Sequence, residues 1–342
     1  MLFKVTPNDV FFTVPTEEEL HKAEDAVAKL CREHIKTCYD NNTEIGQYVH
    51  SILETELEKM HTTDMGFHFL ILYDIAQCSR EAGYPIISLG NFSGSWIAYL
   101  LGITDIEPLP YYTPEIVWGS DANLTKPDCT IGIAPPVRSI LQKYLDEQRG
   151  FSDCDMELFR RISLADNHPC EQLGALAQAT GENPSVDDLD DATYLRAAKD
   201  IIAEFFEENS AAIPLVEEMA QSGRFSFDSL LRLYAFAKGE FSNENGVLDL
   251  NYPNFFVTRE EFFSGLIRHN IPVEIAAEIV KKGVWATGAK RDKYVAILES
   301  YQAPEAIIDY FFTVKNLWSK GSCVGRVLQK CYLAWYREHC PE

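Results

Sequence analysis

The stretch IISLGNFSGSW, residues 86–96, limits the possible folds more than any other part of the chain. Its β-branched start predicts the end of a buried strand, its Gly/Ser segment a tight loop, and the run from Trp96 onward a buried helix. A loop between a strand and a helix can present backbone N–H groups to a phosphate. No Lys or Arg lies between Arg80 and Lys126, however, so the expected phosphate cradle has no cation.

The charge of the chain argues against a nucleic-acid binder. Thirty Lys and Arg stand against 52 Asp and Glu, which gives a net charge of −22, whereas a nucleic-acid binder normally carries a basic surface. The basic residues gather near the C-terminus, where we expect either a solvated helix face or a local nucleic-acid patch. The residues of the candidate patch are Lys290, Arg291 and Lys293, and the candidate stacking residues are Trp285, Trp318 and Trp335, although large aromatic residues at helical spacing are more often packed in a core.

The pattern of apolar residues predicts an α/β N-terminal half followed by helices. We expect neighbouring strands at Ile86–Ser88 and Cys129–Ile133, a strand-like run that passes into a helix within 66–83, and an irregular crossing at 107–118. After Gly150 nearly all segments have helical spacing. The acidic turn NPSVDDLDD at 183–191 separates two helical stretches, so we place the domain boundary there, giving domains 1–182 and 183–342.

Other motifs carry weaker signals. Cys31, His34 and Cys38 share a helix face, but zinc needs a fourth ligand, so we expect no metal site. The string DMELF at 155–159 is similar to peptides that bind sliding clamps, and it also suits the start of an amphipathic helix. The nine cysteines form no CxxC pair, no apolar run reaches about 18 residues, and the N-terminus has no secretory pattern. We therefore expect a cytoplasmic protein with reduced thiols and no membrane contact.

Taken together, three segments carry a family resemblance. The run LETELEKM…GITDIEPLPYY at 53–112 resembles the palm of bacterial C-family replicative DNA polymerases, the DNA polymerase III alpha subunits, nearest to the PolC type. That family has a strand, an S-R-G-S-x-G-S loop, a helix and a run ending in G-I-T-(D/E)-x-(D/N)-P-L. Segments 225–239 and 307–341 resemble its fingers. The resemblance implies an α+β fold, with a nucleotidyltransferase-like palm of a small mixed sheet with helices, followed by an all-α fingers-like region.

The phosphate-binding residues of that family are only partly kept. Its loop Arg and Ser, which bind the phosphates of the incoming nucleotide, correspond to Leu89 and Asn91. In the fingers a Lys is kept, but its His and Arg partners are replaced by Ser322 and Tyr332. The resemblance leaves as a nucleotide-binding remnant Ser88, Gly90, Asn91, Ser93, Gly94, Ser95 and Lys320.

The catalytic carboxylates depart further from the family pattern. The family's P-D-x-D aspartates hold two metal ions, and here the string is Pro127-Asp128-Cys129-Thr130, so one carboxylate remains. The family's third aspartate corresponds best to Ser163, with Asp166 as the alternative. One Asp cannot supply the several oxygen ligands that a pair of Mg²⁺ ions needs.

These departures predict a catalytically inactive homologue that serves as a replication-related interaction protein. We expect a protein partner, weak or absent DNA binding, and no cofactor, with Mg²⁺ needed only if polymerase activity remains. Two alternatives stay open. The chain could be an accessory nucleic-acid-binding module, or a residual DNA-directed nucleotidyltransferase that still binds nucleotides.

Overall fold

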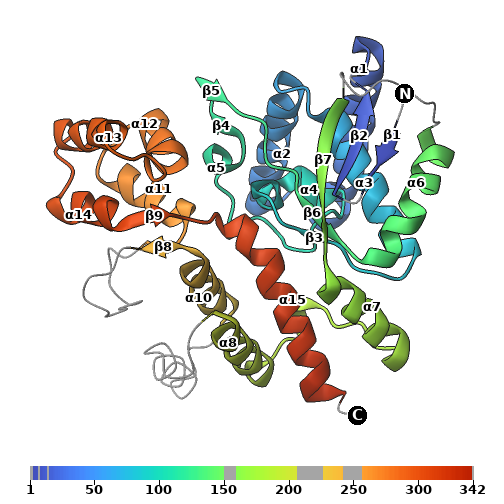
Figure 1. Cartoon of the computed structure of the whole chain (residues 1–342). Coiled ribbons are helices and arrows are strands. Elements are labelled where there is room, and N and C mark those ends of the chain that lie inside the picture. Colours follow the sequence, from blue (N-terminus) through green and yellow to red (C-terminus); the bar gives the residue numbers. More distant parts are fainter. Residues whose placement is uncertain are drawn as a thin grey trace. The chain divides into compact units, whose positions relative to one another are not determined.

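The computed structural model describes residues 3–6, 8–13, 15–149, 159–205, 226–241 and 256–340 (Figure 1). The chain clusters into two compact units, Met1–Tyr112 with Leu124–Asn183 and Thr113–Asn123 with Pro184–Glu342. The boundary between domains 1–182 and 183–342 stays a prediction, and residues 113–123 cluster with the C-terminal part. Most of the DMELF motif and Gly150 lie outside the described residues.

The first unit contains a five-stranded mixed sheet of strand order β1-β2-β7-β6-β3. β7 runs parallel to β6, and the other neighbouring strands are antiparallel. The expected pairing of two neighbouring strands around Ile87 and Ile131 is confirmed, because these segments form β3 and β6. The strands are β1 (Phe3–Val5), β2 (Asp9–Thr13), β3 (Ile87–Ser88), β6 (Ile131–Ile133) and β7 (Phe159–Asp166).

The strand β7 corrects the expectation of nearly continuous helix after Gly150. Ile162 and Leu164 are buried, whereas Arg161 is exposed and Ser163 is half-buried. This alternation has the period of two residues that is typical of a strand. β7 also lies between β2 and β6 in the sheet. The central strand therefore comes from a segment for which the sequence predicted a helix.

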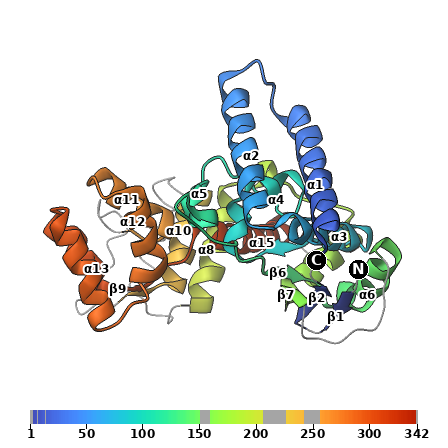
Figure 2. The ribbon, with the colours of Figure 1, turned by 90° about the horizontal axis from the view of Figure 1, so that it is seen from above.

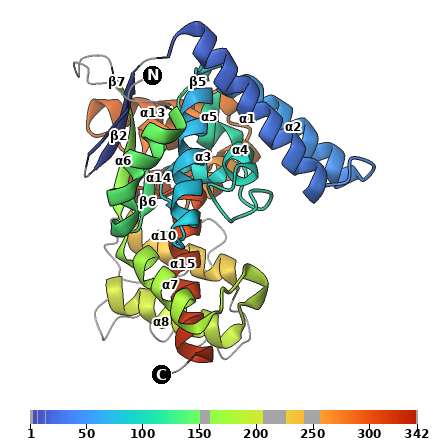
Figure 3. The ribbon, with the colours of Figure 1, turned by 90° about the vertical axis from the view of Figure 1, so that its right-hand side faces the viewer.

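Helices pack around this sheet. The first, α1, begins where expected, since the hydroxyl of Thr16 accepts from the N–H of Glu19 and the Glu19 carboxylate accepts from the N–H of Thr16. α1 and α2 lie side by side as a helical hairpin (Figures 2 and 3). The elements are α1 (Glu17–Cys38), α2 (Glu44–Thr62), α3 (Gly66–Glu81), the 3₁₀ turn η1 (Asn91–Gly94), α4 (Trp96–Leu100), α6 (Pro135–Arg149) and α7 (His168–Thr180).

The prediction of a strand-like run within 66–83 was wrong, because this segment forms the single helix α3. Phe69, Ile71 and Leu72 are fully buried although they point to different sides of the helix. A helix that is apolar on all sides gives a continuous apolar run, which periodicity cannot distinguish from a buried strand.

The second unit is mainly helical. The proline-rich crossing is not wholly irregular, since Pro114 begins the short helix α5 (Pro114–Trp118). Its other elements include the strands β4 (Gly119–Ser120), β8 (Glu240–Phe241) and β9 (Val314–Asn316), and β4 pairs with β5 (Asn123–Leu124). Its further helices are η3 (Val186–Asp188), α8 (Asp191–Phe205), α10 (Phe227–Lys238), α11 (Arg259–Arg268), α12 (Val273–Glu278), the π-helical turn η4 (Ile279–Gly283), α13 (Ala289–Ser300), α14 (Glu305–Thr313) and α15 (Lys320–His339).

An aromatic and aliphatic core holds the second unit together. The rings of Phe262 and Phe311 are fully buried, and the ring of Tyr310 lies 5.1 Å from that of Phe262. A small mixed sheet with helices and a helical remainder confirm the α+β fold class. No helix in the described part of the chain is long and apolar enough to cross a membrane.

Candidate functional site

The Gly/Ser loop follows β3 and lies along β6. The N–H groups of Leu89 and Gly90 donate to the carbonyl oxygen of Thr130, at 2.9 and 3.3 Å. The N–H of Phe92 donates to the carbonyl of Asp128 at 3.5 Å. These backbone donors of the loop therefore bind the protein's own carbonyl groups. Leu89, at the position where the family resemblance implies an Arg, is buried.

Small residues are needed here for packing. A Cβ atom at Gly90 would lie 1.9 Å from the carbonyl oxygen of Asp128, which excludes any larger residue at this backbone position. The hydroxyl of Ser93 donates to the carbonyl of Gly90 at 2.6 Å and also contacts the hydroxyl of Ser88. The Gly and Ser pattern that predicted a phosphate cradle is thus explained by close contacts within the fold.

The N-terminus of α4 is occupied by a carboxylate. Oε2 of Glu56, which is fully buried on α2, accepts from the Ser95 hydroxyl at 2.8 Å and from the Ile97 N–H at 3.1 Å. The Ser95 hydroxyl oxygen also accepts from the N–H of Ala98 at 3.4 Å. The carboxyl group at this helix end takes the position that an anionic ligand would favour.

Asp128, which the family resemblance assigns to the catalytic motif, makes local hydrogen bonds. Its Oδ1 accepts from the Thr130 hydroxyl at 2.7 Å and from the Thr130 N–H at 3.1 Å. Its backbone N–H donates to Oδ1 of Asn91 at 2.7 Å, which ties the loop to the segment before β6. Asp128 and Asn91 therefore serve as a turn and a loop anchor in this geometry.

Thr130 and Ser163 lie at the same level of the sheet. In the parallel pair of β6 and β7, Ile131 stands opposite Leu164, and Thr130 and Ser163 each directly precede these residues. Asp166 stands opposite Ile133, at the other end of the pairing. The topology thus places Thr130, directly before β6, beside Ser163 on the adjacent strand β7.

A carboxylate from β2 lies next to Ser163. Asp9 is the register partner of Ser163, and its Oδ1 accepts from the Ser163 hydroxyl at 3.3 Å. The same oxygen lies 3.5 Å from Nε of Arg161, so Asp9 is balanced by a cation of β7. Among the described residues, no group of three or more His, Cys, Asp or Glu side chains could hold a metal ion.

Lys320 belongs to the other compact unit, at the start of α15. Its ammonium lies 3.6 Å from Oδ1 of Asp228 and 3.9 Å from Oε1 of Glu261, and the side chain is 16% exposed. Its backbone N–H donates to Oε2 of Glu260 at 2.7 Å. Burial raises the pKa of Glu260 to about 7, although the Lys320 N–H opposes this shift.

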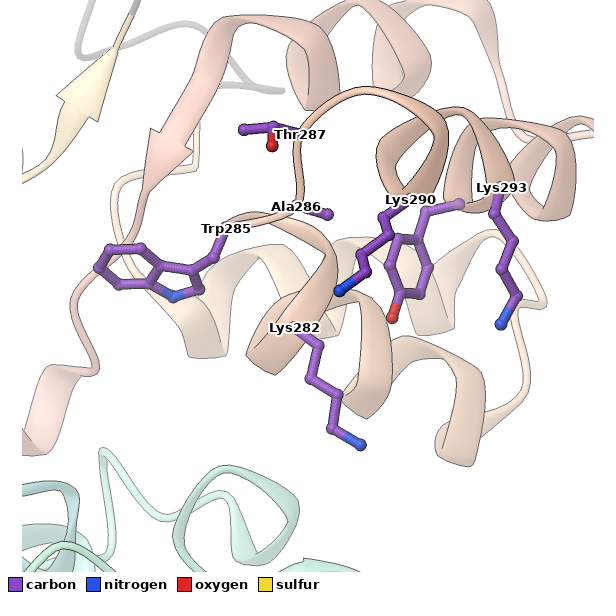
Figure 4. Close-up of a pocket in the computed structure, with 7 residues that line it drawn as sticks. Lys282, Trp285, Ala286, Thr287, Lys290 and Lys293 are labelled. Atoms are coloured by element: carbon purple, nitrogen blue, oxygen red, sulfur yellow. The ribbon is translucent and has the colours of Figure 1, made fainter.

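The three residues of the candidate basic patch separate into two kinds. Lys290 and Lys293 line a pocket with Trp285 (Figure 4). Arg291 instead donates to the carbonyls of Val284, Ala286, Phe311 and Val314. Its guanidinium is a structural crosslink, and a role for Arg291 in a nucleic-acid patch stays a prediction.

The other candidate stacking residues and the cysteine–histidine face of α1 each make local contacts. Trp335 stacks on His339 at 4.9 Å and Trp318 lies under Arg326, and both indoles are half-buried, whereas Trp285 is 52% exposed. On α1 the thiol of Cys31 is buried, and Nδ1 of His34 contacts the carbonyl of Leu100 at 2.6 Å.

Sequence reasoning missed three residues of these sites. Glu56 shares an apolar helix stripe with Leu53 and Met60, and an acid within such a stripe signals burial against a polar partner. Asp9 gave no signal, since its partner Ser163 lies 154 positions away. Lys282 lines the pocket together with Lys290 and Lys293, and the sequence distinguishes it in no way from the other basic residues near the C-terminus.

Comparison with known proteins shows a similarity to bacterial DNA polymerase III. Residues 25–160 match the model of the bacterial DNA polymerase III alpha NTPase domain. PolC-type DNA polymerase III of Streptococcus suis (strain 98HAH33) is 30% identical over 125 residues, 32% of this chain and 8% of that protein. The PolC-type enzyme of Streptococcus pyogenes serotype M5 (strain Manfredo) is 30% identical over 95 residues, 27% of this chain and 6% of that protein.

These matches confirm the resemblance to PolC-type DNA polymerase III alpha subunits and identify a polymerase-like segment related to DNA replication. The aligned part spans less than a tenth of the length of these relatives. The family match ends at residue 160, so the resemblance of 225–239 and 307–341 to the fingers stays a prediction.

Proposed function

We propose that this chain is a catalytically inactive relative of the PolC-type polymerases and acts as a replication-related interaction protein. The observation that carries this proposal is the hydrogen bond from the Thr130 hydroxyl to the Asp128 carboxylate. Where the related polymerases carry two aspartates, one carboxylate remains, and it is used to stabilise a turn.

The Mg²⁺ pair that the family resemblance implies does not fit these residues. A pair of Mg²⁺ ions needs several carboxylate oxygens from the protein. Here Asp128 accepts from Thr130, and Ser163 offers a hydroxyl that already donates to Asp9. We therefore assign no metal-dependent step to this site.

The loop also lacks the features that favour a nucleotide. Its N–H groups at residues 89, 90 and 92 donate to protein carbonyls, and Glu56 places a carboxylate at the start of α4. Glu56 Oε2 already accepts the N–H and hydroxyl donors that a phosphate would bind there. These contacts support loss of nucleotide binding together with loss of catalysis.

The overall charge supports a protein partner. At a net charge of −22, the chain repels DNA over most of its surface and attracts a basic protein at long range. Binding of a nucleic acid at the C-terminal lysines is the second candidate function, because Lys290, Lys293 and Trp285 line one pocket.

One experiment separates the two candidates. The full chain is used to capture proteins from nuclease-treated native lysate, beside a gel-shift assay with primer–template DNA at two salt concentrations. We expect a captured protein that survives nuclease treatment, and no shift below about 1 µM protein. Salt-sensitive DNA binding below that concentration, lost on Lys290→Glu with Lys293→Glu, would support the nucleic-acid function instead. Arg291 is left unchanged, because its loss would disturb the fold.

A further inference from the structure

A basic pocket in the second unit is separate from the palm-like site. It lies at the end of the π-helical turn η4, below the loop 284–288 and beside the first turns of α13, and its volume is about 560 Å³ (Figure 4). π-helical turns are rare and often occur at functional sites. We call it the lysine–tryptophan pocket; its lining residues are Lys282, Trp285, Ala286, Thr287, Lys290, Lys293 and Tyr294.

The pocket is positively charged on an acidic protein. Figure 4 shows the ammonium groups of Lys282, Lys290 and Lys293 directed toward the same open side. Within the described residues, none of these three ammonium groups forms an ion pair. Unpaired cations grouped at one opening attract an anionic ligand and lose little by binding it.

Aromatic surface completes the pocket. The indole of Trp285 is 52% exposed, which is unusual for so large an apolar side chain. Tyr294 is buried, and its hydroxyl donates to Oε1 of Glu278 at 3.0 Å. The pocket therefore offers an apolar contact beside its cations.

The loop that carries Trp285 is held in place before any ligand arrives. The Arg291 guanidinium donates to the carbonyls on both sides of Trp285, those of Val284 at 3.3 Å and Ala286 at 3.2 Å. It also donates to Val314 at 2.7 Å, and so fixes the loop to the start of β9. A preorganised loop reduces the entropy lost on binding.

The cations present act as point charges and bind carboxylates and phosphates alike, so the class of ligand is decided by its length and its aromatic content. Arginine forms two parallel hydrogen bonds with either group, and the local arginine, Arg291, is used on carbonyl groups. Single-stranded nucleic acids also need successive aromatic platforms. In the described part of this unit Trp318 and Trp335 are half-buried against Arg326 and His339, so Trp285 would stack a single base.

We propose that the lysine–tryptophan pocket binds a short acidic peptide segment that carries an aromatic side chain, presented by a partner protein. The carboxylates contact Lys282, Lys290 and Lys293, and the aromatic ring packs on Trp285. A short segment meets the basic pocket alone, whereas an extended polyanion would also meet the acidic surface of the chain. This inference rests on the proposed role as an interaction protein.

The test uses the full chain and a fluorescein-labelled peptide of four aspartates followed by phenylalanine, with binding measured by fluorescence anisotropy. We expect saturable binding that weakens at least about tenfold in the triple variant Lys282→Glu, Lys290→Glu, Lys293→Glu, and several-fold in Trp285→Ala. The matched control reverses three exposed lysines elsewhere, Lys36, Lys199 and Lys315, and so changes the net charge equally. Circular dichroism checks that each variant is folded.

Two further peptides and a nucleic acid define the specificity. Replacing the four aspartates by asparagines, or the phenylalanine by alanine, should each weaken binding at least about fivefold. Equal loss in both triple variants would overturn the inference, as would tighter binding of a labelled ten-nucleotide thymidine strand that depends on the same lysines. Failure of the peptide to bind, while a captured partner is held equally by the wild type and the lysine variant, rejects this pocket but leaves the proposed interaction role intact.

Discussion

The hydroxyl of Thr130 donates a 2.7 Å hydrogen bond to Oδ1 of Asp128, two residues before it. The same carboxylate oxygen accepts from the Thr130 N–H, so the two residues close a small turn ahead of β6. The family resemblance implies metal-binding aspartates at these two positions. Here Thr130 supplies a hydroxyl in place of a carboxylate, and that hydroxyl donates to the carboxylate of Asp128.

Carboxylates at positions 130 and 163 should create metal binding, because Thr130, directly before β6, and Ser163 on β7 lie at one level of the sheet. We expect Thr130→Asp with Ser163→Asp to bind Mn²⁺ at least about tenfold more tightly than the wild-type chain, as measured by electron paramagnetic resonance of free Mn²⁺. The charge-matched control is Thr55→Asp with Ser300→Asp, at exposed positions. Equal gains in both double variants would mean that these positions do not form a metal site.

The buried cap of α4 should be essential for the stability of the first unit. Glu56→Ala leaves the Ser95 hydroxyl without its acceptor and removes one acceptor of the Ile97 N–H. We expect the free energy of unfolding to fall by about 2–4 kcal/mol. Chemical denaturation measures this loss. Glu58→Ala, at an exposed position two residues further along α2, should change the free energy of unfolding by less than about 0.5 kcal/mol. Similar losses for both variants would show that the hydrogen bonds of Glu56 do not contribute specifically to stability.

The sequence predicts the strand, loop and helix around residues 86–100 because each part has a local signal: β-branched residues, small residues and a buried apolar helix. β7 could not be predicted in this way, since its central position depends on pairing with β2 at one side and β6 at the other. Two arginines within the strand also weaken its apolar pattern. Local propensity therefore gives the loop, and long-range pairing gives the sheet.

The site residues follow the same division. Asp128 and Thr130 were found because their spacing matches a motif, but the bond between them appears only in the fold. Glu56 binds Ser95, a residue 39 positions away, and Arg291 binds the carbonyl of Val314, 23 positions away. From the sequence alone, Arg291 is a cation that could bind an anionic ligand. Only the folded structure shows that its guanidinium donates to backbone carbonyl groups instead.

Arg291 should stabilise the second unit. In Arg291→Lys one ammonium cannot reach carbonyls on two sides, because only the planar guanidinium spans Val284 and Val314 together. We expect the free energy of unfolding to fall by about 2–4 kcal/mol. Thermal and chemical denaturation measure this loss, with Lys290→Met as the neighbouring control, expected within about 0.5 kcal/mol of the wild type. A neutral Arg291→Lys would contradict the crosslink.

Glu260 should make stability depend on pH. Burial raises its pKa from an ordinary value of 4.5 to about 7, so the folded chain keeps a proton that the unfolded chain releases between these values. The folded state therefore loses stability as pH rises through this window, by roughly 3 kcal/mol at most. Glu260→Gln keeps an acceptor for the Lys320 N–H but removes the titration.

The measurement is the free energy of unfolding of wild type and Glu260→Gln at pH 4.5 to 8. The difference between the two chains should change over this range in favour of the variant at high pH, whereas Glu299→Gln, at an exposed position, should follow the wild type. A pH-independent difference would show that Glu260 does not titrate in the window.

Primer extension tests the central claim most directly. The full wild-type chain and Asp128→Ala are incubated with primer–template DNA, all four deoxynucleoside triphosphates, and either Mg²⁺ or Mn²⁺, and the extended primer is quantified. Because Thr130 and Ser163 stand where the family resemblance implies carboxylates, we predict no template-dependent incorporation above the background of the Asp128→Ala chain. Template-dependent incorporation by the wild type that Asp128→Ala abolishes would contradict the account.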